Sequence, residues 1–211
     1  MPNKEIRNFD FEVRAEESEE HGHFLSGQPI VFESETRLYS PKIGEYTEII
    51  DRNALAGTDL RDVRFLVNHN TSMIPLARSR NNNENSTMQL VVTDDGMDIR
   101  VDLDVENNAD ARSLYSAVER GDITGMSFMF VVDKDTWTEL NSELPQRRIN
   151  SIERVLEVSA VTFPAYEQSS ITARGLSEAL EGAWASLESA KAEQREIDRK
   201  KQKIKILTEV L

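Results

Sequence analysis

The sequence contains no cysteine, only three histidines and no long apolar run. Without cysteine the chain has no disulfides, no thiolate nucleophile and no cysteine-ligated zinc or iron–sulfur centre. No segment approaches the roughly 18 consecutive apolar residues of a membrane-spanning helix. The polar N-terminus lacks the apolar stretch of a secretory signal. We therefore expect a cytosolic protein with no membrane partner.

Negative charge dominates the composition. The 211 residues hold 25 Lys+Arg and 38 Asp+Glu, a formal net charge of −13, and such a chain is repelled by nucleic-acid phosphates. Residues 1–190 carry a net charge of −16 and residues 191–211 carry +3. All six prolines and eight of the nine glycines lie in residues 1–175. These shifts predict a body over residues 1–175 and a basic helical tail over 176–211.

Short apolar or alternating segments separated by turn residues make the body rich in predicted strands. Val63–Val67, Met126–Val132 and Val155–Val161 are dense apolar runs. Asp94-Asp95-Gly96 separates two alternating runs and predicts a β-hairpin. Strands at this frequency are typical of a barrel or a sandwich.

Helices are predicted at three places. Asp51–Leu55 suggests a short helix, and Asn108–Arg120 a stronger one, with Asn108 as the N-cap and Gly121 as the stop. A long helix is expected from near Leu176, with a weak heptad-like seam.

Three residues could supply nucleophilic chemistry, because a serine needs a base and the base needs an orienting group. His69 follows an apolar strand, Ser127 interrupts one, and Glu157 lies in the middle of another. Each also has a plain structural interpretation. His69 could be an exposed turn residue, Ser127 a strand serine bonded to the backbone, and Glu157 a solvent-facing strand residue. A buried Glu157 would need a partner.

The remaining histidines, His21 and His23, lie beside an acidic loop. Two histidines at a spacing of two, with no clear third ligand, favour a solvated loop over a metal site. We predict no metal and no cofactor.

Three sequence blocks carry a family resemblance. They are LVNHN at Leu66–Asn70, GDITGMSF at Gly121–Phe128 and LEVSAVTFPAY at Leu156–Tyr166. Together with the segments Gly27–Phe32 and Tyr46–Leu55, they resemble the prohead maturation proteases of tailed phages, over about residues 9–175.

The resemblance implies a fold and a site. These proteases are similar to the herpesvirus assemblins, which implies a β-rich α+β fold: a closed antiparallel β-barrel surrounded by helices. It implies a serine endopeptidase in which Ser127 is the nucleophile, His69 the general base and Glu157 the group that orients His69. The herpesvirus enzymes use a second histidine in that third position. Met129 stands where many members have glycine, two residues after the nucleophile.

The donors of the oxyanion hole stay open. Backbone N–H groups are the expected source, with Arg78 or Arg80 as side-chain candidates.

The resemblance also implies partners and a place of action. Such an enzyme is enclosed in the immature capsid, the prohead, in the host cytoplasm. It cuts the scaffold segment of the major capsid protein and then itself. The helical tail is then a docking or self-cleaved segment, and a homo-oligomer is a further expectation, because the herpesvirus relatives work as dimers. Nucleic acid is not an expected partner.

Two other functions compete with this interpretation. One is a non-catalytic capsid-assembly scaffold protein with a coiled-coil tail. The other is a carboxylate-based hydrolase that uses Glu157 with Asp102 or Asp104.

Overall fold

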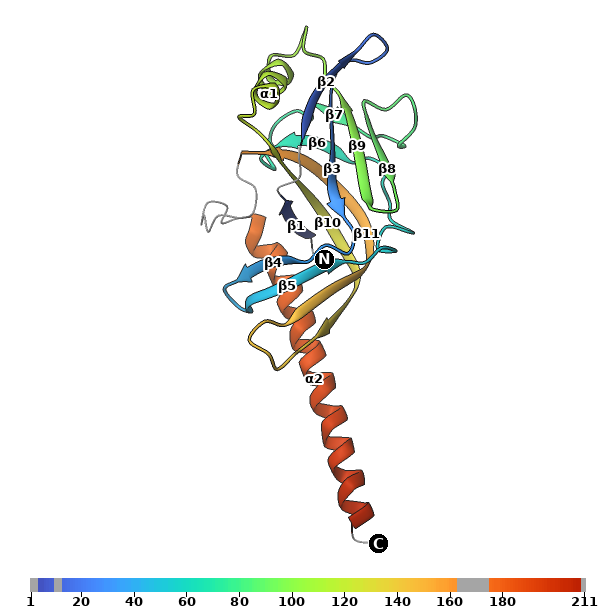
Figure 1. Cartoon of the computed structure of the whole chain (residues 1–211), viewed down its shortest axis with the longest axis vertical. Helices are drawn as coiled ribbons and strands as arrows, with labels where there is room; N and C mark the ends of the chain where they lie inside the picture. Colours follow the sequence, from blue (N-terminus) through green and yellow to red (C-terminus); the bar gives the residue numbers. More distant parts are fainter. Residues whose placement is uncertain (1–3, 10–12, 163–174, 210–211) are drawn as a thin grey trace.

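The computed structural model describes residues 4–9, 13–162 and 175–209, which form two sheets and two helices (Figure 1). The seven-stranded sheet contains β1 (Lys4–Phe9), β4 (Thr36–Ser40), β5 (Gly44–Ile50), β6 (Arg64–Val67), β7 (Ala77–Arg78), β10 (Gly125–Thr138) and β11 (Gln146–Val161). The four-stranded sheet contains β2 (Arg14–Ser18), β3 (Gly22–Val31), β8 (Met88–Val92) and β9 (Gly96–Asp102). The helices are α1 (Ala109–Glu119) and α2 (Gly175–Glu209).

The long antiparallel pair β10 and β11 forms the centre of the larger sheet. Beyond β10 lies β1, which is antiparallel to it. The other side of β11 has two parallel partners in succession. Its first residues, Gln146–Ile149, pair with β5, and Glu157–Ala160 near its end pair with β6. This second pairing brings the end of β6, and the residues that follow it, beside the end of β11.

The predicted barrel is wrong. The strand order β1-β10-β11-β5-β4 is open at both ends, and the second sheet, β2-β3-β9-β8, is a separate open sheet among the described strands. The physical reason lies in β11. On the edge opposite β10 it pairs with two different parallel strands, β5 and β6, so the sheet branches there instead of closing. The two helices described do not surround the sheets.

One apolar core joins the two sheets. It takes Leu25 and Ile99 from the smaller sheet, Phe128 and Ile149 from the larger sheet, and Leu114 from α1. The predicted hairpin is confirmed as β8–β9. Its Gly96 is required by close packing, since a Cβ there would lie 1.9 Å from the Ile30 carbonyl oxygen.

Two of the three helix predictions hold. Asn108 caps α1, accepting hydrogen bonds from the backbone N–H groups of Asp110 and Ala111, and Gly121 follows with a positive φ of 75°. The segment Asp51–Leu55 forms turns instead of a helix, with Asp51 accepting a hydrogen bond from the Asn53 backbone N–H.

The predicted C-terminal helix is present as α2, which packs against β1 and β10 and then extends away from the sheets (Figure 1). Ala183 and Leu187 of α2 are buried in a small second cluster with Tyr46 and Trp137. Farther along, Ile204 is 62% exposed. No helix among the described residues is long and apolar enough to cross a membrane.

Candidate active site

The structure brings His69 and Glu157 into direct contact. Glu157 lies on β11 and His69 follows β6, the parallel neighbour of that part of β11. The Nδ1 atom of His69 contacts the Oε1 atom of Glu157. The Glu157 side chain is 4% exposed and that of His69 is 11% exposed. Glu157 is therefore not a solvent-facing strand residue, and its burial is offset by a partner.

The conformation at the end of β6 is set by two residues in the left-handed region. Asn68 and His69 have φ values of 50° and 55°, which turn the chain directly after the strand. Asn68 ties this turn to β11. Its backbone N–H donates to the Ala160 carbonyl at 2.9 Å, its Nδ2 donates to Thr162 Oγ1 at 3.0 Å, and its Oδ1 accepts from the Thr162 backbone N–H at 2.9 Å. The position of His69 is thus fixed by main-chain and side-chain bonds.

A further serine, Ser159, links the two groups. It is fully buried on β11, two residues after Glu157. Its Oγ donates to Glu157 Oε2 at 2.6 Å and accepts from the His69 backbone N–H at 3.1 Å. One hydroxyl therefore holds both the carboxylate and the backbone of the histidine.

Ser127 lies on the same face of the sheet as this cluster. It pairs with Ser159 across the β10–β11 ladder, and Met129 pairs with Glu157. Because side chains of paired residues project to the same side, Ser127, Ser159 and Glu157 share one face. The Ser127 side chain is fully buried, and its Oγ donates to the Arg7 carbonyl of β1 at 2.8 Å.

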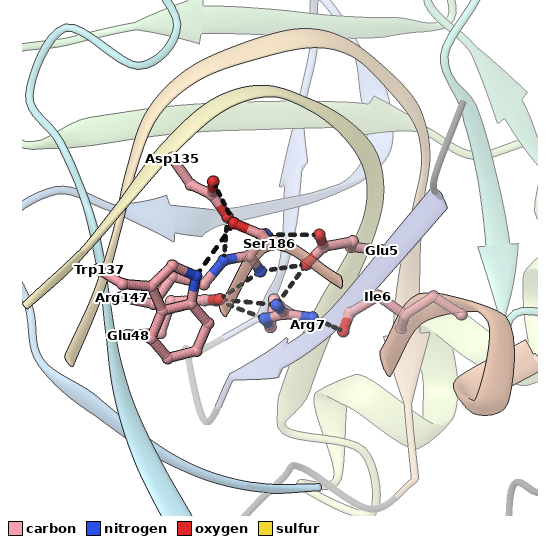
Figure 2. A network of polar contacts seen from close by, with 8 residues as sticks. All are labelled: Glu5, Ile6, Arg7, Glu48, Asp135, Trp137, Arg147 and Ser186. Atoms are coloured by element: carbon pink, nitrogen blue, oxygen red, sulfur yellow. Dashed lines mark hydrogen bonds and ion pairs between the residues drawn. The ribbon is translucent and has the colours of Figure 1, made fainter. Parts of the chain in front are cut away.

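A buried ion cluster lies where β1, β5, β10 and β11 meet (Figure 2). Its β1 members, Glu5 and Arg7, alternate with Asn8, which pairs with Ser127, so they face away from Ser127. Arg7 on β1 bonds Glu5 at 2.5 Å and Glu48 at 2.6 Å. Arg147, which is 1% exposed, bonds Glu5 at 2.6 and 2.8 Å, Glu48 at 3.0 Å and Asp135 at 2.6 Å.

Burial and pairing set the pKa values in this cluster. Burial opposes the charged form of Glu5, but the neighbouring Arg7 and Arg147 outweigh it and lower the pKa of Glu5 below its usual value. Burial raises the pKa of Tyr46 to about 12. The hydrogen bonds between them join five charged side chains into one network: Glu5, Arg7, Glu48, Asp135 and Arg147.

Other residues singled out in the sequence lie elsewhere. Asp102 ends β9 in the smaller sheet, where its carboxylate pairs with Arg100 at 3.1 Å, and Asp104 accepts from the Asn107 backbone N–H at 3.1 Å. Glu157 has His69 and Ser159 as partners instead.

The two arginines considered for the oxyanion hole lie in or after β7. Arg78 donates to Asp62 at 2.5 Å and pairs with Arg64, at the beginning of β6 rather than at its end near His69. Arg80 follows β7, with a φ of 45°.

The two remaining histidines have separate surroundings. His21 approaches Arg100, with 3.0 Å between Nε2 and Nη1, and His23 stacks edge-on against Tyr115. The residues that the structure describes contain no group of three His, Asp or Glu side chains arranged to hold a metal ion.

Sequence reasoning missed three contributors to this arrangement. Ser159 was visible as the strand residue that alternation places beside Glu157, but no role was assigned to it. Asn68 was part of a recognised block, whereas Arg7 lies on a strand that was not predicted. The last residues of the third block, 163–166, lie outside the described residues.

Comparison with known proteins places the chain in a family. The chain is 32% identical over 123 residues to the prohead protease of Enterobacteria phage HK97, an alignment that covers 58% of this chain and 48% of that protein. The chain thus spans about half the length of this curated relative. No solved structure matches. Residues 9–181 match the caudovirus prohead serine protease family, so the chain belongs to that family.

Proposed function

We propose that the chain is a serine endopeptidase with Ser127 as nucleophile, His69 as general base and Glu157 as the group that orients His69. The observation that carries this proposal is the contact between His69 Nδ1 and Glu157, beside a strand on which Ser127 faces the same side. Family membership supports the reaction class.

The chemistry follows from the orientation of the imidazole. An ionised Glu157 accepts the hydrogen of Nδ1, so the neutral ring keeps its lone pair on Nε2. Nε2 then takes the proton of the Ser127 hydroxyl while Oγ attacks the carbonyl carbon of a peptide bond. The Oγ–C bond forms, the amine leaves with the proton from Nε2, and water releases the acyl group by the reverse proton path.

The substrate that we propose is the scaffold segment of the major capsid protein, together with the enzyme itself, inside the prohead. Enclosure of enzyme and substrate in one shell raises their local concentration, so weak recognition of the cleaved segment suffices. The name of the HK97 relative, prohead protease, supports this choice.

Coexpression with the capsid protein of the same phage tests the proposal. Intact mass of both proteins should show cleavage with the wild-type chain and none with Ser127→Ala. Ser113→Ala is the matched control, because this exposed hydroxyl bonds only within α1, at 2.8 Å to the Ala109 carbonyl, among its described contacts. Identical cleavage by the Ser127→Ala chain would favour another nucleophile, and absence of cleavage by both chains would favour the non-catalytic scaffold protein.

We also propose that residues 176–211 form the part that docks on the scaffold or is removed by self-cleavage. The far part of α2 is exposed, as Ile197 and Ile204 are, and residues 191–211 carry a net charge of +3. Binding of the scaffold segment should weaken as salt rises, and deletion of residues 191–211 should remove that dependence. Binding that is unchanged by the deletion would exclude this role.

A further inference from the structure

The nucleophile of the proposed site is closed off by the N-terminal strand. Ser127 is 0% exposed, and the carbonyl oxygen of Arg7 lies 2.8 Å from its Oγ. A scissile carbonyl carbon must come within roughly 3–3.5 Å of Oγ to react. In this conformation a backbone carbonyl of the chain itself already occupies the neighbourhood that a substrate carbonyl needs.

The pairing of β1 resembles the way an extended peptide binds to a sheet. Lys4–Phe9 pair antiparallel with Val131–Met126 without a register shift, and Asn8 stands opposite Ser127. The β10 edge therefore offers its N–H and C=O groups to a strand that passes directly in front of the nucleophile. Strand addition at such an edge is a general mode of peptide recognition.

The buried charges allow β1 to leave. The strand contributes Glu5 and Arg7 to the ion cluster, a pair whose charges cancel. When both depart, Glu48 loses its bonds from Arg7, but Arg147 keeps its bonds to Glu48 at 3.0 Å and to Asp135 at 2.6 Å. Loss of a single charged partner would leave a buried ion without a partner. Loss of this neutral pair leaves Arg147, Glu48 and Asp135 connected to one another.

Although α2 packs against it, β1 is a peripheral strand of the sheet. The family match begins at residue 9, so nearly all of β1 lies outside it. The strand is also the terminal member of the seven-stranded sheet and pairs with β10 alone among the described strands. Its anchoring side chains, Glu5 and Arg7, project to the face opposite Ser127, so they hold the strand without contributing to the site.

We propose that β1 is a displaceable strand that keeps the protease closed, and that the β10 edge it occupies is the binding site for an extended peptide substrate. This inference rests on the proposed function of Ser127. Activation then requires β1 to detach, after which a substrate strand pairs with β10 and places its scissile carbonyl where the Arg7 carbonyl now lies.

The absence of cysteine makes a direct test possible in the full chain. Ile6 and Met129 are paired across the β1–β10 ladder, and a disulfide suits residues directly opposite each other on neighbouring strands. The double variant Ile6→Cys/Met129→Cys should hold β1 in place when oxidised and release it when reduced. The matched control, Val91→Cys/Asp98→Cys, ties the β8–β9 hairpin at two exposed paired positions.

The readout is covalent labelling by a fluorophosphonate, which needs no knowledge of the natural substrate. Ser127 Oγ forms the O–P bond, fluoride leaves and His69 takes the proton. We expect the oxidised Ile6→Cys/Met129→Cys chain to resist labelling and the reduced chain to be labelled, while the control variant is labelled in both states. Equal labelling of Ser127 in the oxidised and reduced lock variant would overturn the inference.

The wild-type chain separates this outcome from failure of the proposed function. If Ser127 is the nucleophile, the wild type is labelled with or without reductant and Ser127→Ala is not. Amide hydrogen exchange provides a second measurement on the wild-type chain. Labelling should speed exchange across Lys4–Phe9 while the β10–β11 ladder stays protected. Unchanged protection of Lys4–Phe9 in the labelled protein would also contradict a displaceable β1.

Discussion

Replacement of Ser159 by alanine removes the hydroxyl that joins the two groups of the proposed base. The lost bonds are the 2.6 Å donation to Glu157 Oε2 and the 3.1 Å acceptance from the His69 backbone N–H. A hydrogen bond to a charged group contributes about 1.5–3 kcal/mol. If this free energy is lost from the stabilisation of the transition state, the rate falls by about tenfold to somewhat over a hundredfold.

The assay compares kcat, KM and the rate of fluorophosphonate labelling for wild type and Ser159→Ala. We expect kcat and the labelling rate to fall while KM stays unchanged, since Ser159 contacts the base and not the substrate. Ser79→Ala is the control for a purely structural loss, because this fully buried hydroxyl also bridges two backbone groups, Leu60 O and Val63 N, each at 2.9 Å. A folded Ser159→Ala chain with wild-type kcat would refute the reasoning.

Three further predictions concern stability. The Tyr46 hydroxyl is buried without a hydrogen-bond partner among the described residues, so Tyr46→Phe should raise the free energy of unfolding by about 1–3 kcal/mol. Because the pKa of Tyr46 is raised from 10.0 to about 12, the wild type should lose stability as pH rises from 10 to 12, and denaturant titrations of Tyr46→Phe should show a shallower loss. The pKa of Glu5 is lowered from 4.5. The ionised carboxylate therefore stabilises the folded chain above that pH, and this stabilisation is lost as the pH falls through the lower pKa of the folded state. Glu5→Gln should be about 3–5 kcal/mol less stable at pH 7, with a flatter acid limb, and an unchanged acid limb would contradict the assignment. Leu187→Ala should cost about 2–5 kcal/mol in thermal unfolding, whereas Ile204→Ala, at an exposed position of the same helix, should cost almost nothing; equal costs would show that α2 does not dock through Leu187.

The parts of the fold that follow from local chemistry were predictable. The Asn108 cap, the Gly121 stop and the hairpin turn before Gly96 each depend on a few adjacent residues. The topology did not follow in the same way. The choice of β5 and then β6 as parallel partners of β11 depends on residues about a hundred positions apart, and no local pattern indicates whether a sheet closes or branches.

The proposed site, too, was only partly predictable from the sequence. His69, Ser127 and Glu157 were noticeable because each departs from what its surroundings in the chain favour: a polar residue in or after an apolar strand. Ser159 gave a weaker signal, since a serine in a strand has many uses. The N-terminal strand gave none, because a short polar segment with alternating charges gives no sign that its charges are buried.

The sequence by itself determined which side chains are available for catalysis. With no cysteine, serine became the main candidate nucleophile, and the resemblance of three sequence blocks to a protease family indicated which serine, histidine and carboxylate to consider. Only the tertiary structure decided that His69 and Glu157 touch, that Ser159 holds both, and that β1 covers Ser127. The reason is that burial and hydrogen bonding between distant segments depend on how the strands pair, and this pairing is settled by the packing of the whole chain.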